Sequence, residues 1–546
     1  MDNPIHNIVI VGGGTAGWIT AGLLAAEHNA DQGVLAVNPK LTISLIESPD
    51  VPIIGVGEGT WPSMRLTLQK IGISETEFLL CCDASFKQGS KFINWRGPLV
   101  QSATFPTRTG QLSSTTTSKK SSHTDSYLHP FSLPIGQQDI NLCPFWLPFQ
   151  QDIAFADAVC QQYQLSEIGF APKQITTPEY SFVNNYGYHL NASKFSQLLQ
   201  KHITEKLGVR YIADHVLAIN NQPSGDIASV LTREHGEIVG DLFVDCSGLR
   251  AMLLGDHLQV PFVSQQHVLF NDSALAVQMP YPQADAPIAS CTHSTAQSCG
   301  WIWDIALPTR RGIGHVYSSA HTSDTAAEQQ LRHYLSKDFG ADAANSAEFR
   351  KLSIAPGHRA VCWKNNCIAI GMAAGFIEPL EASALAMVEW TAKTLSSLLP
   401  ANRGVMDIVA KRLNQTFLQH WQQIIEFLKL HYVLSQRTDH DYWHDHRESS
   451  SIPGSLQDAL QLWRYQVPSA NDISHSDVLF PAASYQYVLY GMGFQTELTG
   501  SPKPSLQRKA QQLFNENIQR IQKLKLMLDD NRSLLQKIRQ HGLPKI

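Results

Sequence analysis

Residues 8–18 read IVIVGGGTAGW, and they indicate how the N-terminal part of the chain folds. Four β-branched apolar residues predict a buried strand, and residues 16–27 continue with the small and apolar residues of a helix. Between them Gly12, Gly14 and Gly17 form the spacing GxGxxG. A strand, a tight turn and a helix in this order present backbone N–H groups and a positive helix end to a pyrophosphate. The pattern therefore predicts a dinucleotide-binding α/β unit.

The next predicted strand supplies an acidic residue for the same ligand. Residues 41–46 are apolar and lead into Glu47, whose carboxylate can accept a hydrogen bond from a ribose hydroxyl. A structural glycine-rich turn would fit the spacing alone, whereas strand, helix and acidic residue together favour a dinucleotide. FAD is favoured over NAD, because nicotinamide enzymes usually keep this unit contiguous, while residues 241–248 (DLFVDCSG) and 366–375 (NCIAIGMAAG) look like later strands returning to the cofactor. The candidate cofactor-binding residues are Gly12, Gly13, Gly14, Thr15, Ala16, Gly17, Glu47, Val216, Met372 and Leu385.

Length and composition exclude several classes of protein. A chain of 546 residues exceeds the roughly 250–300 residues of one hydrophobic core, so we expect several packed subdomains. The 42 basic and 47 acidic residues leave a net charge of −5, which provides no electrostatic footprint for nucleic acid or anionic lipid. No signal peptide is recognisable, and the nine cysteines are scattered without a CxxC pair. We therefore expect a cytoplasmic protein without a nucleic-acid or membrane partner.

The organisation of the chain follows from changes in composition. Residues 1–105 carry the dinucleotide turn, and residues 106–126 are so rich in Ser and Thr that we expect an exposed insertion. Residues 127–400 continue the cofactor-binding unit, and residues 401–546 show mostly helical patterns. The pattern over residues 505–540 favours a helix packed on its own domain over a coiled-coil partner helix, because its register breaks at Asn531.

Five separated segments carry a family resemblance. They are GGGTAGW at 12–18, GVGEGTWP at 55–62, FKQGSKFINW at 86–95, GWIWDIAL at 300–307 and GFIEPLEAS at 375–383. With these segments in this order, the chain resembles a flavin-dependent halogenase of the tryptophan-halogenase type. The resemblance implies an α/β fold, with an FAD-binding Rossmann-like domain (aromatic-hydroxylase/reductase-like) built from discontinuous segments and a mostly helical substrate-binding subdomain. One departure is Ala306, which stands where the family motif WxWxIP has its proline.

The resemblance also implies the reaction and its participants. Reduced FAD, O2 and chloride or bromide give hypohalous acid, which halogenates a separate aromatic substrate. The sequence shows no NAD(P)H module, so the reduced flavin is expected in trans from a separate NAD(P)H-dependent flavin reductase. A flavin monooxygenase that inserts oxygen and a noncatalytic FAD-binding protein are the alternatives.

Two side chains match the catalytic residues of the family. Lys87 in the FK segment would hold the halogenating agent, by hydrogen bonding or as a haloamine, and Lys91 is its rival one helical turn away. Glu381 of the PLE segment would accept a proton from the substrate or orient the reagent. Spacing alone does not separate Glu381 from Glu378, and the resemblance favours Glu381.

The resemblance places further residues around the reagents. The backbone amides of Ser383 and Ala384, at the start of a predicted helix, would bind the halide. His129 and Phe131 match a pair that flanks the aromatic substrate, and Trp301 and Trp303 match residues that separate flavin from substrate. Regiospecific tryptophan halogenases carry a late Tyr-Tyr pair followed by a glutamate that clamps the amino acid head, whereas residues 484–494 (SYQYVLYGMGF) have no adjacent Tyr pair. We therefore expect indole or an indole-bearing molecule, rather than free tryptophan, as substrate.

A cluster of potential metal ligands lies at residues 440–446. His440 and His444 share a helical face with Asp441 and Asp445 nearby. The segment is polar apart from Tyr442 and Trp443, which favours a solvated, partly acidic segment over a metal site.

Overall fold

The computed structural model describes residues 4–29, 40–51, 57–97, 125–472, 478–498, 500 and 503–545. Its first layer is a six-stranded sheet with the strand order β20-β21-β12-β1-β2-β8. β1 pairs in parallel with both β2 and β12, and β12 pairs in parallel with β21. The strands are β1 (Asn7–Val11), β2 (Thr42–Glu47), β8 (Arg210–Ala213), β12 (Leu242–Asp245), β20 (Trp363–Lys364) and β21 (Cys367–Ala369). A mostly parallel sheet assembled from distant segments, with only β20 antiparallel to its neighbour among the described strands, confirms the predicted discontinuous α/β unit.

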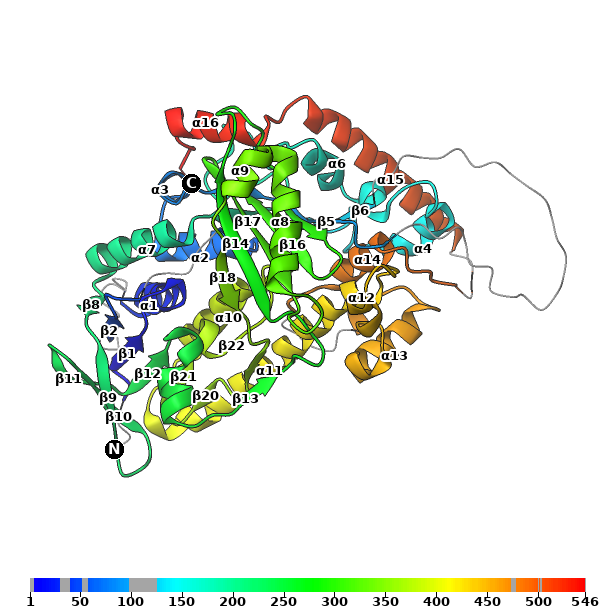
Figure 1. The fold of residues 1–546 in the computed structure, drawn as a ribbon. Coiled ribbons are helices and arrows are strands. Elements are labelled where there is room, and N and C mark those ends of the chain that lie inside the picture. Colours follow the sequence, from blue (N-terminus) through cyan, green and yellow to red (C-terminus); the bar gives the residue numbers. More distant parts are fainter. Residues whose placement is uncertain are drawn as a thin grey trace, which may run out of the picture.

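Helices α1 (Thr15–His28), α7 (Ala192–Leu207) and α10 (Ser383–Ser397) pack together beside this sheet. α1 follows the glycine turn directly and buries most of its length, because small residues such as Gly17 and Ala21 allow close packing. Figure 1 shows the sheet and these helices at one end of the molecule. A small antiparallel sheet of β9 (Val216–Asn221), β10 (Ile227–Thr232) and β11 (Gly236–Val239) extends from the same end.

A seven-stranded sheet forms the centre of the molecule (Figure 1). Its order is β18 (Arg350–Ser353), β14 (Ser273–Pro280), β17 (Arg310–Tyr317), β16 (Trp301–Ala306), β15 (Thr292–Ala296), β5 (Gly89–Ile93) and β6 (Ser126–Pro130). Neighbouring strands are antiparallel, except that β15 and β5 are parallel. The WIWDIA sequence thus lies in an inner strand, flanked by β17 and β15. A second small sheet joins β13 (Phe262–Ser264), β19 (Gly357–Arg359) and β22 (Gly375–Phe376).

A three-stranded sheet connects the cofactor-binding unit with the central sheet. It has the order β3 (Glu58–Gly59), β7 (Gly187–Leu190) and β4 (Ser85–Lys87). Lys87 pairs with Gly187, and Gly59 pairs with His189. Because side chains alternate along a strand, Lys87 and His189 share one face, and Tyr188 points to the other.

The other helices include α2 (Ser63–Ile71), α3 (Glu75–Cys81), α4 (Cys143–Trp146), α5 (Phe155–Val159), α6 (Gln162–Glu167), α8 (Asp324–Phe339), α9 (Ala341–Ser346), α11 (Arg403–Val433), α12 (Asp441–Asp445), α13 (Gly454–Trp463), α14 (Ala482–Gly491), α15 (Pro504–Lys525) and α16 (Asn531–His541). The predicted single pattern over residues 505–540 is two helices, because the chain turns after Lys525 and Asp530 caps α16. α15 buries Leu513 and Leu524 against the protein's own core.

Packing crosses the predicted subdomain boundary at residue 400. α11 reaches back to the cofactor-binding unit, where Phe417 and Trp421 line its cavity. α14 and α15 pack against α4 and α5 in a separate apolar cluster. Figure 1 shows these helices together at the end opposite β1.

The structure describes only the end of the predicted insertion. Residues 106–124 of the predicted insertion lie outside the described residues, and Ser126, its predicted last residue, begins β6. Within the described residues, none of the helices combines the length and the apolar composition that crossing a membrane requires.

Candidate active site

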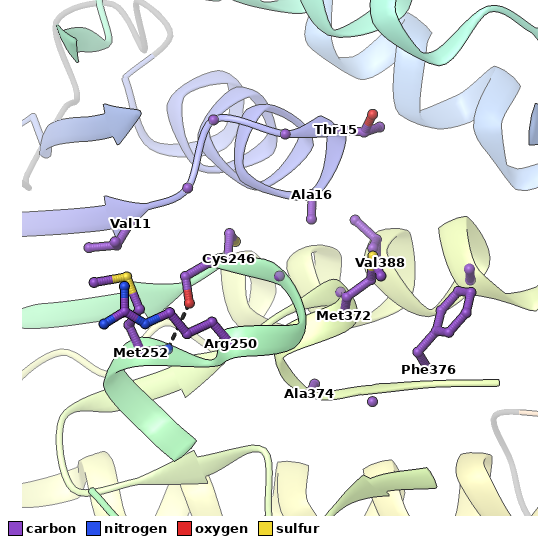
Figure 2. A pocket seen from close by; sticks show the side chains of 18 of the residues that line it. Val11, Thr15, Ala16, Cys246, Arg250, Met252, Met372, Ala374, Phe376 and Val388 are labelled. Atoms are coloured by element: carbon purple, nitrogen blue, oxygen red, sulfur yellow. Dashed lines mark hydrogen bonds between the residues drawn. The ribbon is translucent and has the colours of Figure 1, made fainter. Parts of the chain in front are cut away.

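The predicted dinucleotide turn lines a cavity of about 700 Å³. β1 ends at Val11 and α1 begins at Thr15, so the turn between them faces this space (Figure 2). Figure 2 shows Thr15 and Ala16 on one side of the cavity, and Met372 and Val388 on the other. The candidate cofactor residues that line it are Gly12, Gly13, Gly14, Thr15, Ala16, Glu47, Val216, Met372 and Leu385.

The glycines of the turn fit a bound pyrophosphate. Gly12 has φ +118°, and a Cβ there would lie 2.1 Å from the carbonyl oxygen of Cys246. A Cβ on Gly14 would meet nothing within 4 Å, so its side toward the cavity is open. Gly17 does not line the cavity; a Cβ there would lie 2.0 Å from the oxygen of Gly12, so its role is to let α1 approach the turn. A tight turn, an open amide face and Glu47 at the edge together fit a dinucleotide.

Ser383 and Ala384, the predicted halide-binding residues, line the same cavity. They begin α10, and the residue before them, Ala382, takes the left-handed conformation at φ +55°. No side chain caps this helix, and its first turn contains no acidic residue. Uncapped N–H groups at the positive end of a helix suit an anion, so the arrangement is compatible with the predicted halide site.

Lys87 lies outside the residues that line the cavity, on the other side of β3. Glu58 faces the cavity, whereas a Cβ on the next residue, Gly59, would lie 3.0 Å from Lys87 Nζ. Lys87 is 1% exposed, and its Nζ stands 5.3 Å from the centre of the Phe131 ring. Burial lowers the pKa of Lys87 to about 8, opposed by the charge of Glu381. Within the described part of the chain, Nζ has no hydrogen bond or ion pair.

The rival lysine has a different environment. The prediction that Lys91 lies one helical turn from Lys87 is wrong, because the two residues stand on the separate strands β4 and β5. Lys91 Nζ pairs with Glu167 at 2.6 Å, and both side chains are partly exposed. Lys91 therefore has the surroundings of an ordinary surface charge.

Glu381 is held by two histidines from distant elements. His129 Nδ1 on β6 lies 3.0 Å from Glu381 Oε1, and His431 Nε2 on α11 lies 3.2 Å from the same oxygen, off the hydrogen-bond direction. Burial alone would raise the pKa of Glu381, but His129 and His431 lower it to about 2. Trp61 Nε1 donates to the backbone carbonyl of Glu381 at 2.7 Å. The carboxylate is thus a fixed buried anion.

Glu378 belongs to a second, separate group. Its Oε2 accepts hydrogen bonds from Trp301 Nε1 (2.7 Å), Asn271 Nδ2 (2.5 Å) and Tyr432 OH (2.8 Å). Its Oε1 is buried without a hydrogen-bond partner among the described residues, and Glu378 lines the cavity of the glycine turn. Burial raises the pKa of Glu378, against these three donors. Glu378 and Glu381, the two acids of the GFIEPLEAS segment, therefore have different surroundings.

The predicted aromatic residues divide in the same way. His129 and Phe131 lie beside Glu381 and Lys87 respectively, at the end of β6. Trp301 and Trp303 on β16 are buried, and neither is among the described residues that line the cavity. Ala306, in place of the family's proline, pairs with Arg311 of β17, so β16 continues regularly through it.

The prediction of a solvated segment at residues 440–446 is wrong for its later part. Tyr442 and Trp443 are fully buried, and His446 stacks on Tyr432 with ring centres 4.1 Å apart. His446 Nδ1 also accepts from Lys429, a buried lysine at 2.9 Å. Asp441, His444 and Asp445 are exposed as expected, and His440 is the half-buried residue that caps α12. The error arises because burial here comes from segments distant in the sequence, including α11 and Phe270, which local composition does not reveal.

Sequence reasoning missed several residues of the site. They are Glu58, Tyr127, His431, Tyr432 and Ser484. His431 and Tyr432 are adjacent on α11. His431 contacts Glu381, and Tyr432 contacts Glu378. Burial raises the pKa of Glu58 to about 7, and its Oε2 has no partner among the described residues. Glu58 stands inside the quoted GVGEGTWP segment, so its acid within a glycine-rich run was a usable signal.

Comparison with known proteins places these features in one family. The tryptophan halogenase family model matches residues 7–507. The tryptophan 6-halogenase SttH of Streptomyces toxytricini is 31% identical over 512 residues, which cover 90% of each chain.

Solved structures extend the likeness to the fold. The crystal structure of a tryptophan halogenase from Shewanella frigidimarina has a TM-score of 0.93 and 61% identity, covering 100% of this chain and 99% of that one. A tryptophan C-6 flavin-dependent halogenase from taromycin biosynthesis has a TM-score of 0.84 and 29% identity, covering 98% of this chain and 100% of its own. The first match covers the whole chain, and therefore also the cavity and the region of Lys87 and Glu381.

Proposed function

We propose a function from one premise: the chain belongs to the tryptophan halogenase family. It is a flavin-dependent halogenase. We propose that it halogenates an electron-rich aromatic substrate of the indole type with chloride or bromide. The observation that carries this proposal is that Lys87 lies across β3 from the cavity of the glycine turn, and that Glu381 is also buried outside the described residues that line this cavity.

The cofactor is FAD, bound by the glycine turn and Glu47. We propose that it arrives in reduced form from a separate NAD(P)H-dependent reductase in the cytoplasm, where thiols stay reduced; all nine cysteines, each within the described residues, are free. Bound reduced FAD, with O2 and halide, supplies hypohalous acid. The amides of Ser383 and Ala384 hold the halide at the cavity wall.

In the halogenation step, Lys87 acts on the hypohalous acid and Glu381 acts on the aromatic ring. The ring forms a carbon–halogen bond, while the halogen–oxygen bond of hypohalous acid breaks. Lys87, as the ammonium, hydrogen bonds the reagent oxygen and gives a proton to the leaving hydroxide, which becomes water. Glu381 takes the proton that the ring carbon loses. The overall change is an aromatic C–H and hypohalous acid converted to an aryl halide and water.

The substrate proposal rests on the contacts of α14. An amino acid head needs paired charges or several fixed hydrogen bonds when it is buried. Tyr487 OH donates to the carbonyl of Ser132 at 3.0 Å, and Tyr490 OH lies 3.2 Å from Thr496 Oγ1. Glu497, the nearest following acid, is exposed. With these groups engaged elsewhere, we propose indole or an indole-bearing molecule without a free amino acid head.

One incubation tests the reaction. The protein is mixed with FAD, a flavin reductase, NADH, O2 and either halide, and a panel of indoles and phenols is screened by mass spectrometry for halogen isotope patterns. A halide-dependent product supports the proposal. An oxygenated product that forms without halide would instead identify a monooxygenase, and flavin binding without any product would identify a noncatalytic protein.

Steady-state kinetics test the substrate class. Indole, tryptamine and tryptophan differ in the head group that the site must accommodate. We expect higher kcat/KM for indole or tryptamine than for tryptophan. A clear preference for tryptophan would overturn the proposal on the substrate and leave the halogenase reaction standing.

A further inference from the structure

A buried chain of side chains surrounds the carboxylate of Glu381. Ser484 Oγ lies 2.9 Å from His129 Nε2, and His129 Nδ1 lies 3.0 Å from Glu381 Oε1. On the other side, Tyr127 OH lies 2.6 Å from His431 Nδ1, and His431 Nε2 is 3.2 Å from Glu381 Oε1. All five side chains are buried. Two branches therefore meet at one carboxylate oxygen.

In the branch through His431, the hydrogen bond from Tyr127 decides which imidazole nitrogen carries the proton. Burial lowers the pKa of His431 and raises that of Tyr127 well above 10, so a neutral imidazole faces a protonated phenol. If the imidazole proton were on Nδ1, the bare Nε2 lone pair would face the carboxylate of Glu381. With Tyr127 OH donating to Nδ1, the proton sits on Nε2, which lies 3.2 Å from Glu381 Oε1 but off the hydrogen-bond direction, so the N–H acts on the carboxylate as a nearby positive dipole end.

The plane of the His431 ring is fixed by packing. The ring stacks on Phe92 with centres 4.5 Å apart and planes 21° apart. Phe427, one turn earlier on α11, meets it edge-on at 5.5 Å. Rotation of the ring away from Glu381 would break both contacts, so its Nε2 remains beside the carboxylate.

We propose that His431, with its proton placed by Tyr127, is a positioning residue that keeps Glu381 ionised and its Oε1 engaged. This inference rests on the proposed function and deepens it. Oε2 is then the oxygen that takes the substrate proton, because within the described residues it has no hydrogen-bond partner. The proposal explains why a fully buried histidine sits one residue before Tyr432 on α11, where an apolar residue would pack equally well.

The titratable groups that the structure describes around Glu381 come from three elements. Lys87 acts on it from β4, His129 and Tyr127 from β6, and His431 from α11. Lys87 and His129 remain in place when His431 is changed, so the effect of His431 is separable from theirs. Loss of the nearby His431 N–H leaves Glu381 with less electrostatic compensation for burial, which raises its pKa.

Three variants test the proposal through the pH dependence of halogenation. His431→Phe keeps the stacking on Phe92 and removes both nitrogens. His431→Gln is the matched control, because its side-chain amide keeps a donor near the position of Nε2. Tyr127→Phe removes only the hydroxyl that places the proton. Flavin affinity and thermal unfolding establish that each variant is folded.

The measured quantity is the ratio of variant to wild-type kcat between pH 7 and pH 5. We expect this ratio to fall about tenfold or more toward pH 5 in His431→Phe, less in Tyr127→Phe, and little in His431→Gln. A flat ratio in His431→Phe, or equal profiles for the Phe and Gln variants, would overturn the proposal. If His431→Phe does not fold, Tyr127→Phe decides alone: a falling ratio supports the role, and a flat one overturns it. Failure of the proposed function would appear separately, as a wild-type protein without halide-dependent product.

Discussion

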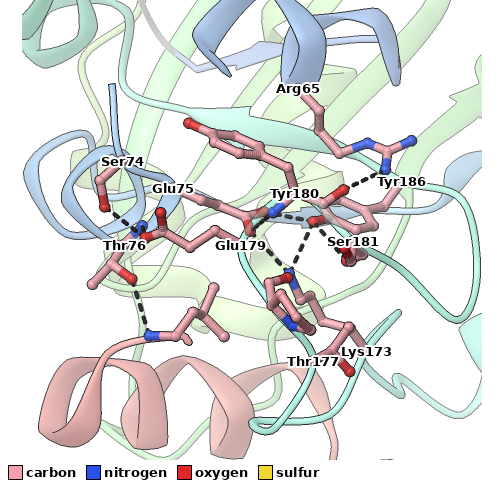
Figure 3. Close-up of polar contacts among 12 residues, drawn as sticks. Arg65, Ser74, Glu75, Thr76, Lys173, Thr177, Glu179, Tyr180, Ser181 and Tyr186 are labelled. Atoms are coloured by element: carbon pink, nitrogen blue, oxygen red, sulfur yellow. Dashed lines mark hydrogen bonds and ion pairs between the residues drawn. The ribbon is translucent and has the colours of Figure 1, made fainter. Parts of the chain in front are cut away.

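Lys173 and Lys87 are both buried near a glutamate, and their surroundings are opposite. Lys173 Nζ lies 2.9 Å from Glu75 Oε2, and Glu75 Oε1 accepts a hydrogen bond from Tyr186 OH at 2.6 Å (Figure 3). The same oxygen accepts a second hydrogen bond from Tyr188 OH at 2.7 Å. Lys173 also donates to the carbonyl of Pro178 at 2.8 Å. Lys87 and Glu381 are equally buried but form no ion pair in the described structure. Lys173 and Glu75 thus form a direct ion pair, whereas Lys87 and Glu381 do not. We call the face of the sheet with Lys173 and Glu75 the closed face, and the face with Lys87 the open face.

The two pairs lie on opposite faces of the same sheet. β7 and β4 run side by side, with Phe86 opposite Tyr188 and Lys87 opposite Gly187. The face with Tyr188 supports Glu75, and the face with Lys87 belongs to the proposed active site. Removing one member of a satisfied buried pair destabilises the fold, whereas a buried charge without a close partner retains the capacity to bind or transfer a proton. The comparison predicts that mutations on the two faces separate stability from catalysis.

The largest expected effect is on the open face. We expect Lys87→Ala to abolish halogenation, because it removes the donor to the reagent, while flavin binding and flavin-dependent O2 consumption persist. Product analysis and an oxygen electrode measure the two quantities on the same sample. Lys91→Ala, which breaks the exposed pair with Glu167, is the control and should keep substantial activity. Retained halogenation in Lys87→Ala would contradict the catalytic role proposed for Lys87.

The converse effect is expected on the closed face. Lys173→Met leaves the carboxylate of Glu75 buried without its cation, and we expect a loss of about 3–5 kcal/mol in the free energy of unfolding. Below its melting temperature, the folded variant should halogenate at nearly the wild-type rate. Denaturant unfolding measures the first quantity and steady-state kinetics the second. Lys91→Ala again serves as control, with an expected loss below about 1 kcal/mol. A stable but inactive Lys173→Met would contradict the division of roles.

The two glutamates of the GFIEPLEAS segment, Glu378 and Glu381, allow a second comparison between neighbouring residues. We expect Glu381→Gln to slow halogenation on the order of a hundredfold, the contribution of a positioned acid or base. Glu378→Gln should act mainly on folding or flavin affinity, because Glu378 holds Trp301, Asn271 and Tyr432 beside the cavity. Kinetics and flavin titration of both variants separate the effects. The reverse ranking would transfer the catalytic role to Glu378, and two silent changes would end the general-base assignment.

Local patterns predicted the parts of the protein that local interactions form. The strand, glycine turn and helix at residues 8–27 were predictable because the turn requires glycine at Gly12 and the helix follows at once. Lys87 and Glu381 were found through motifs, although the motif for Lys87 did not reveal that it lies in a strand.

The supporting residues were not predictable, for a physical reason. Tyr127 and His431 are 304 residues apart in sequence, and each is an unremarkable polar residue in its own segment. Their significance arises only when β6 and α11 pack together. The same limit explains the error at His446, whose burial depends on Phe270 and Tyr432.

The last prediction concerns the charge of the open lysine. Burial lowers the pKa of Lys87 to about 8, and the pKa of Glu381 is lowered to about 2 by its histidines. Between these values Lys87 is mostly the ammonium and Glu381 the carboxylate, the two forms that the proposed step requires. Halogenated product per O2 consumed should therefore be level below pH 8 and fall about tenfold per pH unit well above it.

The opposite sign distinguishes the haloamine route, in which the neutral amine of Lys87 reacts and product per O2 rises through pH 8. Lys87→Arg is the matched variant, because a guanidinium stays charged throughout this range and forms no amine. Any residual activity of Lys87→Arg should lack the alkaline fall. If the fall remains in Lys87→Arg, it belongs to the hypohalous acid or the flavin, and the titration assigned to Lys87 is wrong. A rise through pH 8 in the wild type would show that the lysine is held apart from Glu381 in order to lose its proton, rather than to donate one.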